Sequence, residues 1–125
     1  MKQLQPQTKG ILLALFCTLI VSVAQILLKK ASATFSLAPS QILQQFQNYP
    51  LVIGVLLYVI GAFFFIKAFR LGDLSVIYPV MASGYVVVTI LSVFFLQEVI
   101  VLQKWFGMIF IMVGVILIGR SGGKQ

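Results

Sequence analysis

The sequence predicts an all-α membrane protein with four transmembrane helices joined by short loops. Of its 125 residues, 61% are hydrophobic and only 9% are charged, and the mean hydropathy is +1.11. A soluble domain has about 25% charged residues, so this chain cannot cover a surface that faces water. Its apolar segments are each near the length, about 20 residues, that crosses a hydrocarbon core of about 30 Å. They lie at residues 10–29, 50–69, 74–96 and 104–120.

The composition also excludes several classes of function. The net charge is +7, but the basic residues lie at the ends of apolar segments, where they set topology, and form no patch interleaved with aromatic residues. We therefore expect no nucleic-acid partner. The chain has no histidine, two acids and one cysteine, Cys17, which lies inside the first segment. Metal ligation and nucleophile–base catalysis lack the residues they need, so we expect no metal, no cofactor and no enzymatic activity.

The first segment, residues 10–29, carries a polar stripe. Thr18, Ser22, Gln25 and Lys29 are spaced four, three and four residues apart, which places them on one face of a helix. One interpretation is that the hydroxyls bond to carbonyls of their own helix and that Lys29 extends to the membrane interface. A buried amide such as Gln25 needs several partners, however. The sharper interpretation is that the stripe lines a polar cavity and binds substrate.

The loop at residues 31–49 is uncharged and contains one possible short helix. Ser40, after a proline, can act as an N-cap. Ile42, Leu43 and Phe46 then recur at helical spacing among glutamines. This pattern favours a short amphipathic helix in the membrane interface, and a plain surface loop is the equal alternative.

The second segment, residues 50–69, is predicted to form a hairpin with the third. Gly54 and Gly61 are seven residues apart and share a face on which another helix can pack closely. The turn that follows is very short. Gly72 can end one helix and Asp73 can cap the next, with a proton-carrying role for Asp73 as the lesser alternative.

The third segment, residues 74–96, is uncharged but polar for a membrane span. Tyr78, Ser83 and Tyr85 need partners that lipid does not offer, so we expect them to line the substrate path. Pro79 removes one backbone hydrogen bond and predicts a kink in this helix.

The fourth segment, residues 104–120, is predicted to serve packing and association. Gly107 and Gly114 share a face, again seven residues apart, and no polar side chain lies between Phe106 and Ile118. Four helices enclose little room for a ligand, and a pocket of about 300 Å³ or more forms more easily between two copies. We therefore expect a dimer.

Four spans place both termini on one side of the membrane. Six of the nine basic residues lie on that side and three on the other. The excess of positive charge predicts cytoplasmic tails at residues 1–9 and 121–125, and a non-cytoplasmic loop at residues 31–49. The same bias predicts that every copy inserts in one orientation.

The motif Ser75-Val-Ile-Tyr-Pro-Val-Met81, followed by Val88-Thr89, Glu98 and the paired glycines of the last segment, resembles the drug/metabolite transporter superfamily. Its small four-span members include the small multidrug resistance proteins, the EamA-type half-transporters and the aminoarabinose-lipid flippase subunits. The resemblance implies a transporter in the bacterial inner membrane.

Among these members, the small multidrug resistance proteins have a glutamate eight residues before a Leu-x-Lys lysine. This chain matches the lysine with Lys29 but has Val21 in place of the acid, and Met81 stands where those proteins have a tryptophan. Their cation-exchange machinery is therefore missing at its centre.

The flippase subunits are more similar, through the run Ser22-Val-Ala-Gln25, through Lys29 and through Tyr78-Pro79. That resemblance implies transport of an undecaprenyl-phosphate-linked sugar by a pair of small chains, homodimeric or heterodimeric. It also implies that the hydroxyls and the amide bond the sugar, while Lys29 or Lys30 holds the phosphate. A cation or drug exporter and a structural subunit of a larger complex are the alternatives.

Overall fold

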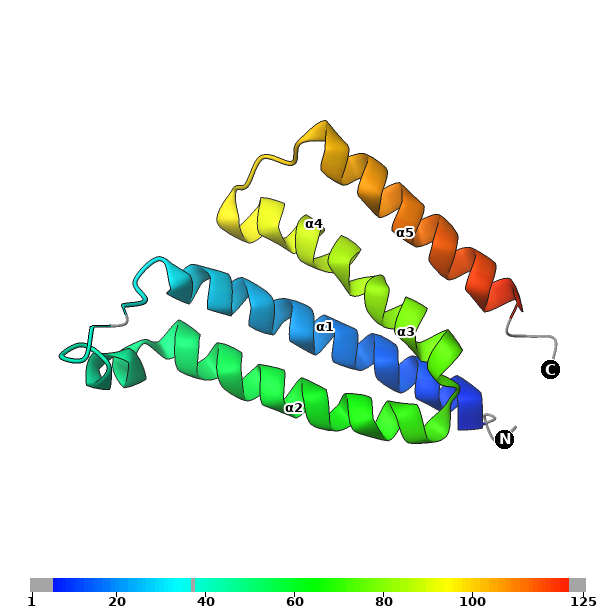
Figure 1. Cartoon of the computed structure of the whole chain (residues 1–125), viewed down its shortest axis with the longest axis horizontal. Helices are drawn as coiled ribbons and strands as arrows, with labels where there is room; N and C mark the ends of the chain where they lie inside the picture. The colour runs from blue at the N-terminus through cyan, green and yellow to red at the C-terminus, as the bar shows by residue number, and fades with distance from the viewer. Residues whose placement is uncertain (1–5, 37, 122–125) are drawn as a thin grey trace.

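The computed structural model describes residues 6–36 and 38–121, and all regular structure in this part of the chain is helical (Figure 1). The predicted all-α fold class is confirmed. The outer parts of the predicted tails, residues 1–5 and 122–125, lie outside the described residues. The elements are α1 (Pro6–Ser32), η1 (Leu43–Gln47), α2 (Tyr49–Leu71), α3 (Leu74–Ala82), α4 (Gly84–Leu96) and α5 (Leu102–Ser121).

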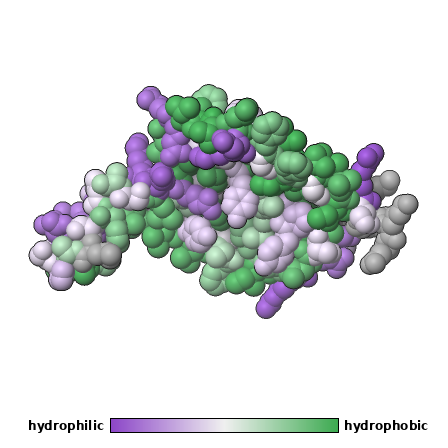
Figure 2. Space-filling view, turned by 45° about the horizontal axis from the view of Figure 1, so that its top comes forward, coloured by the Kyte–Doolittle hydropathy of each residue, from purple (hydrophilic) through white to green (hydrophobic). Residues whose placement is uncertain are grey.

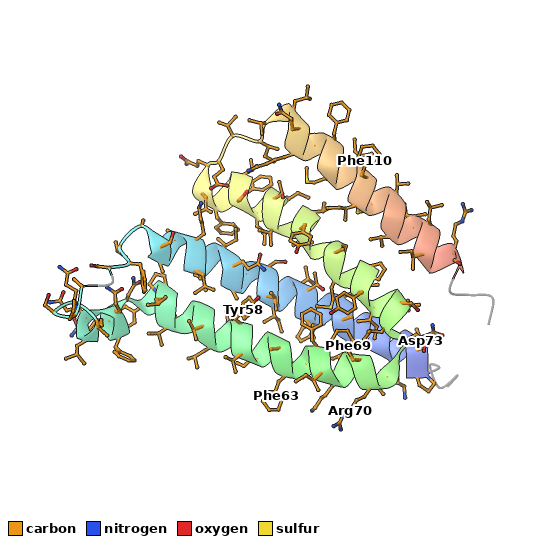
Figure 3. All side chains as sticks on the ribbon, in the orientation of Figure 1. Tyr58, Phe63, Phe69, Arg70, Asp73 and Phe110 are labelled. Carbon is orange, nitrogen blue, oxygen red and sulfur yellow. The ribbon has the colours of Figure 1, made fainter. Side chains whose placement is uncertain are left out.

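Three helical stretches are long and apolar enough to cross a membrane. They are α1, α2 and the combined α3–α4 stretch Leu74–Leu96, whereas the apolar part of α5, Leu102–Ile118, is shorter. Large apolar side chains cover the outside, and Phe63 and Phe110 point away from the bundle (Figure 3). An apolar exterior suits contact with lipid. The protein is therefore an integral membrane protein, and the fourth crossing remains a prediction.

The helices lie side by side in the order α2, α1, the α3–α4 stretch and α5 (Figure 1). Helix α2 packs antiparallel along one side of α1. Helices α3 and α4 lie against the other side of α1, and α5 contacts α3 (Figure 1). The start of α1, the α2–α3 turn and the end of α5 lie at one end of the molecule. Both ends of the described chain thus lie at the same end of the molecule. This arrangement is compatible with the prediction that both termini are on one side of the membrane. Which side of the membrane they face remains a prediction.

Glycines set how closely the helices approach α1. A Cβ atom at Gly54 would lie 3.0 Å from Cγ of Leu28, and one at Gly61 would collide with Val21. A Cβ atom at Gly84 would lie 2.6 Å from Cγ2 of Thr18. Gly54 and Gly61 therefore pack α2 onto α1 within one chain and are not free for a second copy.

The α2–α3 turn falls where it was predicted, but Asp73 does not cap α3 with its side chain. Asp73 occupies the N-cap position without a side-chain hydrogen bond. Its backbone carbonyl accepts the N–H groups of Val76 and Ile77, both at 3.0 Å. The backbone thus closes the first turn of α3, and the carboxylate is left exposed.

The loop helix also differs from the prediction at its start. Helix η1 is a 3₁₀-helix that begins at Leu43, and Ser40 is not its N-cap. The N–H of Gln41 donates to the carbonyl of Ala38 at 2.9 Å, so a backbone turn occupies the expected cap region. Leu43 and Phe46 are exposed, and the interfacial position of this helix remains a prediction.

The third segment is interrupted one turn after its proline. Pro79 lies inside α3, and the interruption falls at Ser83, between α3 and α4. Pro79 cannot donate to Ser75, four residues before it. One turn later, the N–H of Ser83 is shared between the carbonyls of Pro79 and Val80, at 3.3 and 3.2 Å. This shared hydrogen bond accompanies the interruption at Ser83, and the kink at Pro79 remains a prediction.

Candidate functional site

A cavity of about 470 Å³ lies between α1, α2 and the α3–α4 stretch. Its volume is within the range of small-molecule sites, about 300–1,000 Å³. A single chain thus contains a ligand-sized space, which the sequence had led us to expect more readily between two copies. Five of the seven predicted substrate-binding residues line it: Thr18, Ser22, Gln25, Tyr78 and Tyr85.

The α1 wall combines two satisfied hydroxyls with an accessible amide. Thr18 Oγ1 donates to the carbonyl of Ala14 at 2.8 Å, and Ser22 Oγ donates to the carbonyl of Thr18 at 2.6 Å. Both side chains are buried and their hydroxyl hydrogens are already donated, so only acceptor lone pairs remain. Gln25 lies half-buried in the same wall, and its amide can both donate and accept. The self-bonding interpretation therefore describes the hydroxyls, and Gln25 is the polar group that is left for a ligand.

The opposite wall is aromatic. The rings of Phe65 and Phe69 stack with centroids 6.4 Å apart, and those of Phe69 and Tyr78 stack at 5.8 Å. Figure 3 shows Phe69 between α2 and α3. Tyr78 and Tyr85 are 59% and 64% exposed, which leaves them accessible to a ligand.

Sequence reasoning missed the contribution of α2 to this wall. Tyr58, Phe65 and Phe69 all line the cavity. They are spaced seven and four residues apart, which is the spacing of one helix face. That aromatic face is the signal that could have identified them.

A second, smaller cavity of about 300 Å³ opens where α1 and α4 end and α5 begins. It is lined by Lys29, Glu98 and Lys104, together with Thr89 and Ser92. Gln25 and Val88 line both cavities, so the two spaces adjoin. In Figure 2, hydrophilic atoms reach from one edge of the molecule into the middle of a largely apolar surface.

Lys29 forms an ion pair in this smaller cavity. Its Nζ lies 3.6 Å from Oε1 of Glu98, and the two side chains are 64% and 35% exposed. Such partly exposed pairs contribute only about 0–1 kcal/mol, so the contact is easily exchanged for another. Glu98 lies in the loop that follows α4. Gln97, with a φ of 53°, ends α4 and turns the chain, and the N–H of Glu98 donates to the carbonyl of Ser92 at 3.4 Å.

Two predicted positions lie apart from the larger cavity. Lys29 belongs to the smaller one, and Ser83 is among the lining residues of neither. The hydroxyl of Ser83 donates to the carbonyl of Val80 at the break between α3 and α4. Gly107 and Gly114 lie on α5, where an added Cβ atom would meet nothing within 4 Å.

Comparison with known proteins identifies the family of this chain. Residues 37–120, which are 84 of the 125 residues, match the model of the EamA-like transporter family. The chain belongs to the EamA-like transporter family. This membership confirms the resemblance to the drug/metabolite transporter superfamily and points to transport rather than catalysis.

Several proteins are similar to this EamA-like chain. An uncharacterized protein of Sinorhizobium fredii is 37% identical over 102 residues, which cover 80% of this chain and 86% of that protein. A probable 4-amino-4-deoxy-L-arabinose-phosphoundecaprenol flippase subunit, ArnE, of Photorhabdus laumondii is 30% identical over 71 residues, which cover 57% of this chain and 63% of that subunit. The similarity to flippase subunits is thus confirmed.

A plant relative is similar over part of its length only. The probable magnesium transporter NIPA9 of Arabidopsis thaliana is 32% identical over 79 residues, which cover 63% of this chain and 23% of that transporter. The EamA-like chain therefore spans about a quarter of that protein. No solved structure matches the chain.

Proposed function

We propose that this EamA-like protein is a small transporter or flippase that moves a lipid-linked sugar or another amphipathic polar solute across the membrane, acting as a dimer. The cavity of about 470 Å³ supports this proposal most directly, because it combines one accessible amide with an aromatic wall inside an apolar bundle. The similarity to the flippase subunit of Photorhabdus laumondii agrees with it. We also propose that the protein lies in the bacterial inner membrane, that it crosses this membrane four times and that both of its termini are in the cytoplasm.

The lining chemistry suits a sugar better than a free cation. Gln25 can donate to and accept from sugar hydroxyls, and the hydroxyl groups of Tyr78 and Tyr85 can do the same. The stacked rings of Phe69 and Tyr78 offer a flat apolar surface to the C–H face of a sugar ring. Few polar groups in a largely apolar cavity are typical of sites that fix the orientation of a small molecule.

Charge argues against a cation exporter or a magnesium site in the larger cavity. Val21 lines this cavity at the position where the resemblance to small multidrug resistance proteins implies an acid. No acidic residue is among the described lining residues, and the described residues hold no cluster of three candidate metal ligands. Mg²⁺ is usually bound through one or two carboxylates.

Helix α5 offers the surface for a partner. Of its described residues, only Met108 is buried within the chain, and the positions of Gly107 and Gly114 are open. Glycines at such spacing let a second helix approach closely. We propose that α5 packs against a second copy or against a similar small membrane protein.

Transport into reconstituted vesicles tests the proposed function. Gln25→Leu and Tyr78→Leu should abolish uptake of a fluorescent undecaprenyl-phosphate-linked sugar without preventing membrane insertion. Tyr49→Leu is the matched control, because Tyr49 is exposed and lines neither cavity. Full activity in both cavity variants would refute the proposal.

The two alternatives make different predictions in the same preparation. Proton release by the purified protein upon addition of a quaternary ammonium compound would favour a cation exporter. A purely structural subunit predicts no ligand binding, so thermal stabilisation by the lipid-linked sugar would count against that role. Cross-linking through single cysteines on α5 measures the dimer, and Gly114→Leu should reduce it.

A further inference from the structure

We infer that the smaller cavity binds a phosphate group, which Lys29 and Lys104 hold and for which Glu98 is the displaceable internal counter-ion. This inference rests on the proposed function and deepens it, because it names the cavity and the charged residues that hold the phosphate of the lipid-linked solute. The three charged groups come from three different elements: the last turns of α1, the loop after α4 and the first turn of α5. Their convergence on one cavity of about 300 Å³ is the observation that carries the inference.

The available donors in this cavity are mainly cationic. The hydroxyls of Thr89 and Ser92 are engaged, because they donate to the carbonyls of Tyr85 and Thr89 at 2.7 and 2.8 Å. The ammonium groups of Lys29 and Lys104 therefore supply the free donors, with the Gln25 amide at the inner end. Charge-assisted hydrogen bonds to a phosphate are about twice as strong as those between neutral groups.

The charge balance favours an anion. Two lysines and one glutamate give the cavity a formal charge of +1. Lys104 also lies in the first turn of α5, where the helix dipole disfavours a cation and favours an anion nearby. The Lys29–Glu98 ion pair, at 3.6 Å and partly exposed, contributes little to stability, so little free energy is lost when it opens. A phosphate that enters can replace the Glu98 carboxylate as the partner of Lys29.

The cavity is placed to hold one end of a larger ligand. Gln25 and Val88 line both cavities, so a phosphate beside Lys29 can be joined to a polar group in the larger space. Lys30 lies next to Lys29 in the sequence but lines neither cavity, and it is exposed. The geometry thus selects Lys29 from the two lysines that the resemblance left open.

Ligand binding to the full chain in maltoside detergent, which carries no phosphate, tests this inference. The probes are undecaprenyl phosphate, undecaprenol and inorganic phosphate. Undecaprenyl phosphate should bind saturably, and undecaprenol about tenfold more weakly or worse. Lys29→Gln and Lys104→Gln should each weaken phosphate-lipid binding by about tenfold, Lys29→Arg should retain it, and Glu98→Gln should tighten it several-fold.

Lys30→Gln is the matched control, with the same charge change at the same end of the molecule, and it should leave binding unchanged. If Lys30→Gln and Lys29→Gln weaken binding of undecaprenyl phosphate equally, the effect is due to general surface charge and the inference is overturned. Binding of undecaprenol as tight as that of undecaprenyl phosphate would also overturn it. Saturation by inorganic phosphate, with the same lysine dependence, would support the site and assign it to the free ion. Saturation by the lipid alone would assign it to a lipid headgroup.

The outcome is separable from that of the proposed function. Binding of undecaprenyl phosphate with the expected lysine dependence, but without transport in vesicles, would uphold the phosphate site and refute the transporter. Transport that survives Lys29→Gln and Lys104→Gln together would uphold the transporter and refute the phosphate site.

Discussion

Replacing Gly84 by alanine should destabilise the bundle by forcing α4 away from α1. The new Cβ atom would lie 2.6 Å from Cγ2 of Thr18, whereas ordinary contacts between such atoms are 3.4–4 Å. Thr18 cannot turn aside cheaply, because its hydroxyl donates to the carbonyl of Ala14 at 2.8 Å and its side chain is buried. The helices must then separate by about 1 Å, and overpacking of this kind costs about 1–3 kcal/mol. We expect a loss of about 2 kcal/mol.

The same contact predicts a specific rescue. Thr18→Ser removes the obstructing methyl group but keeps the hydroxyl, and alone it should cost about 1 kcal/mol for the lost packing. In the double variant the alanine methyl takes the vacated space. Its total loss should therefore be about 1 kcal/mol rather than the additive 3, which corresponds to a coupling energy of about 2 kcal/mol.

Unfolding in mixed micelles, at a detergent ratio that keeps the chain monomeric, measures these free energies. Gly114→Ala serves as the control, because its Cβ atom would meet nothing within 4 Å in the single chain. A Gly84→Ala variant as stable as Gly114→Ala, or a double variant that shows the full additive loss, would refute the close approach of α4 to α1.

Three further predictions concern other parts of the fold. Gly61→Ala should destabilise the α1–α2 pair by about 1–3 kcal/mol, because the new Cβ atom collides with Val21; Val21→Ala should relieve that loss when both variants are unfolded in the same micelles. Gln97→Gly should raise the unfolding free energy by about 1 kcal/mol, because Gln97 has a left-handed φ of 53° that glycine adopts without steric cost; an unchanged midpoint would contradict this. Cys17 is fully buried, so a small maleimide should label it only after unfolding, and rapid labelling of the native protein would show that α1 is not covered as described.

The sequence predicted the helical segments well because hydrophobicity dominates their formation. Charged and turn residues marked the ends, and the short Gly72-Asp73 turn reverses the chain as predicted. The two helices that it joins do not pack along each other as a hairpin, because α1 lies between α2 and the α3–α4 stretch. The boundaries were less accurate. Within the described residues, α1 runs from Pro6, before the predicted start, and continues past Lys29 to Ser32. The interruption at Ser83 depends on local hydrogen-bond sharing that no residue pattern reveals.

The site was predicted only in part, because the sequence does not show which groups satisfy one another. The stripe from Thr18 to Lys29 was found by its spacing, yet the same spacing fits lining residues and self-bonded ones. Only the structure separates Gln25 from the two hydroxyls. The pairing of Lys29 with Glu98 joins residues 69 positions apart and needs the bundle to bring α1 to the loop after α4.

The polar residues along one face of α1 therefore differ in their roles. Thr18 and Ser22 form the closed end, where Gly84 allows α4 to pack against them. Gln25 stands where the two cavities meet, and Lys29 reaches the open, charged end. A solute that uses all of these positions must have an anionic end, a polar middle and an apolar remainder that can stay in lipid. Because α4 touches α1 at the closed end and lines both cavities, movement of α4 alone would change access to both.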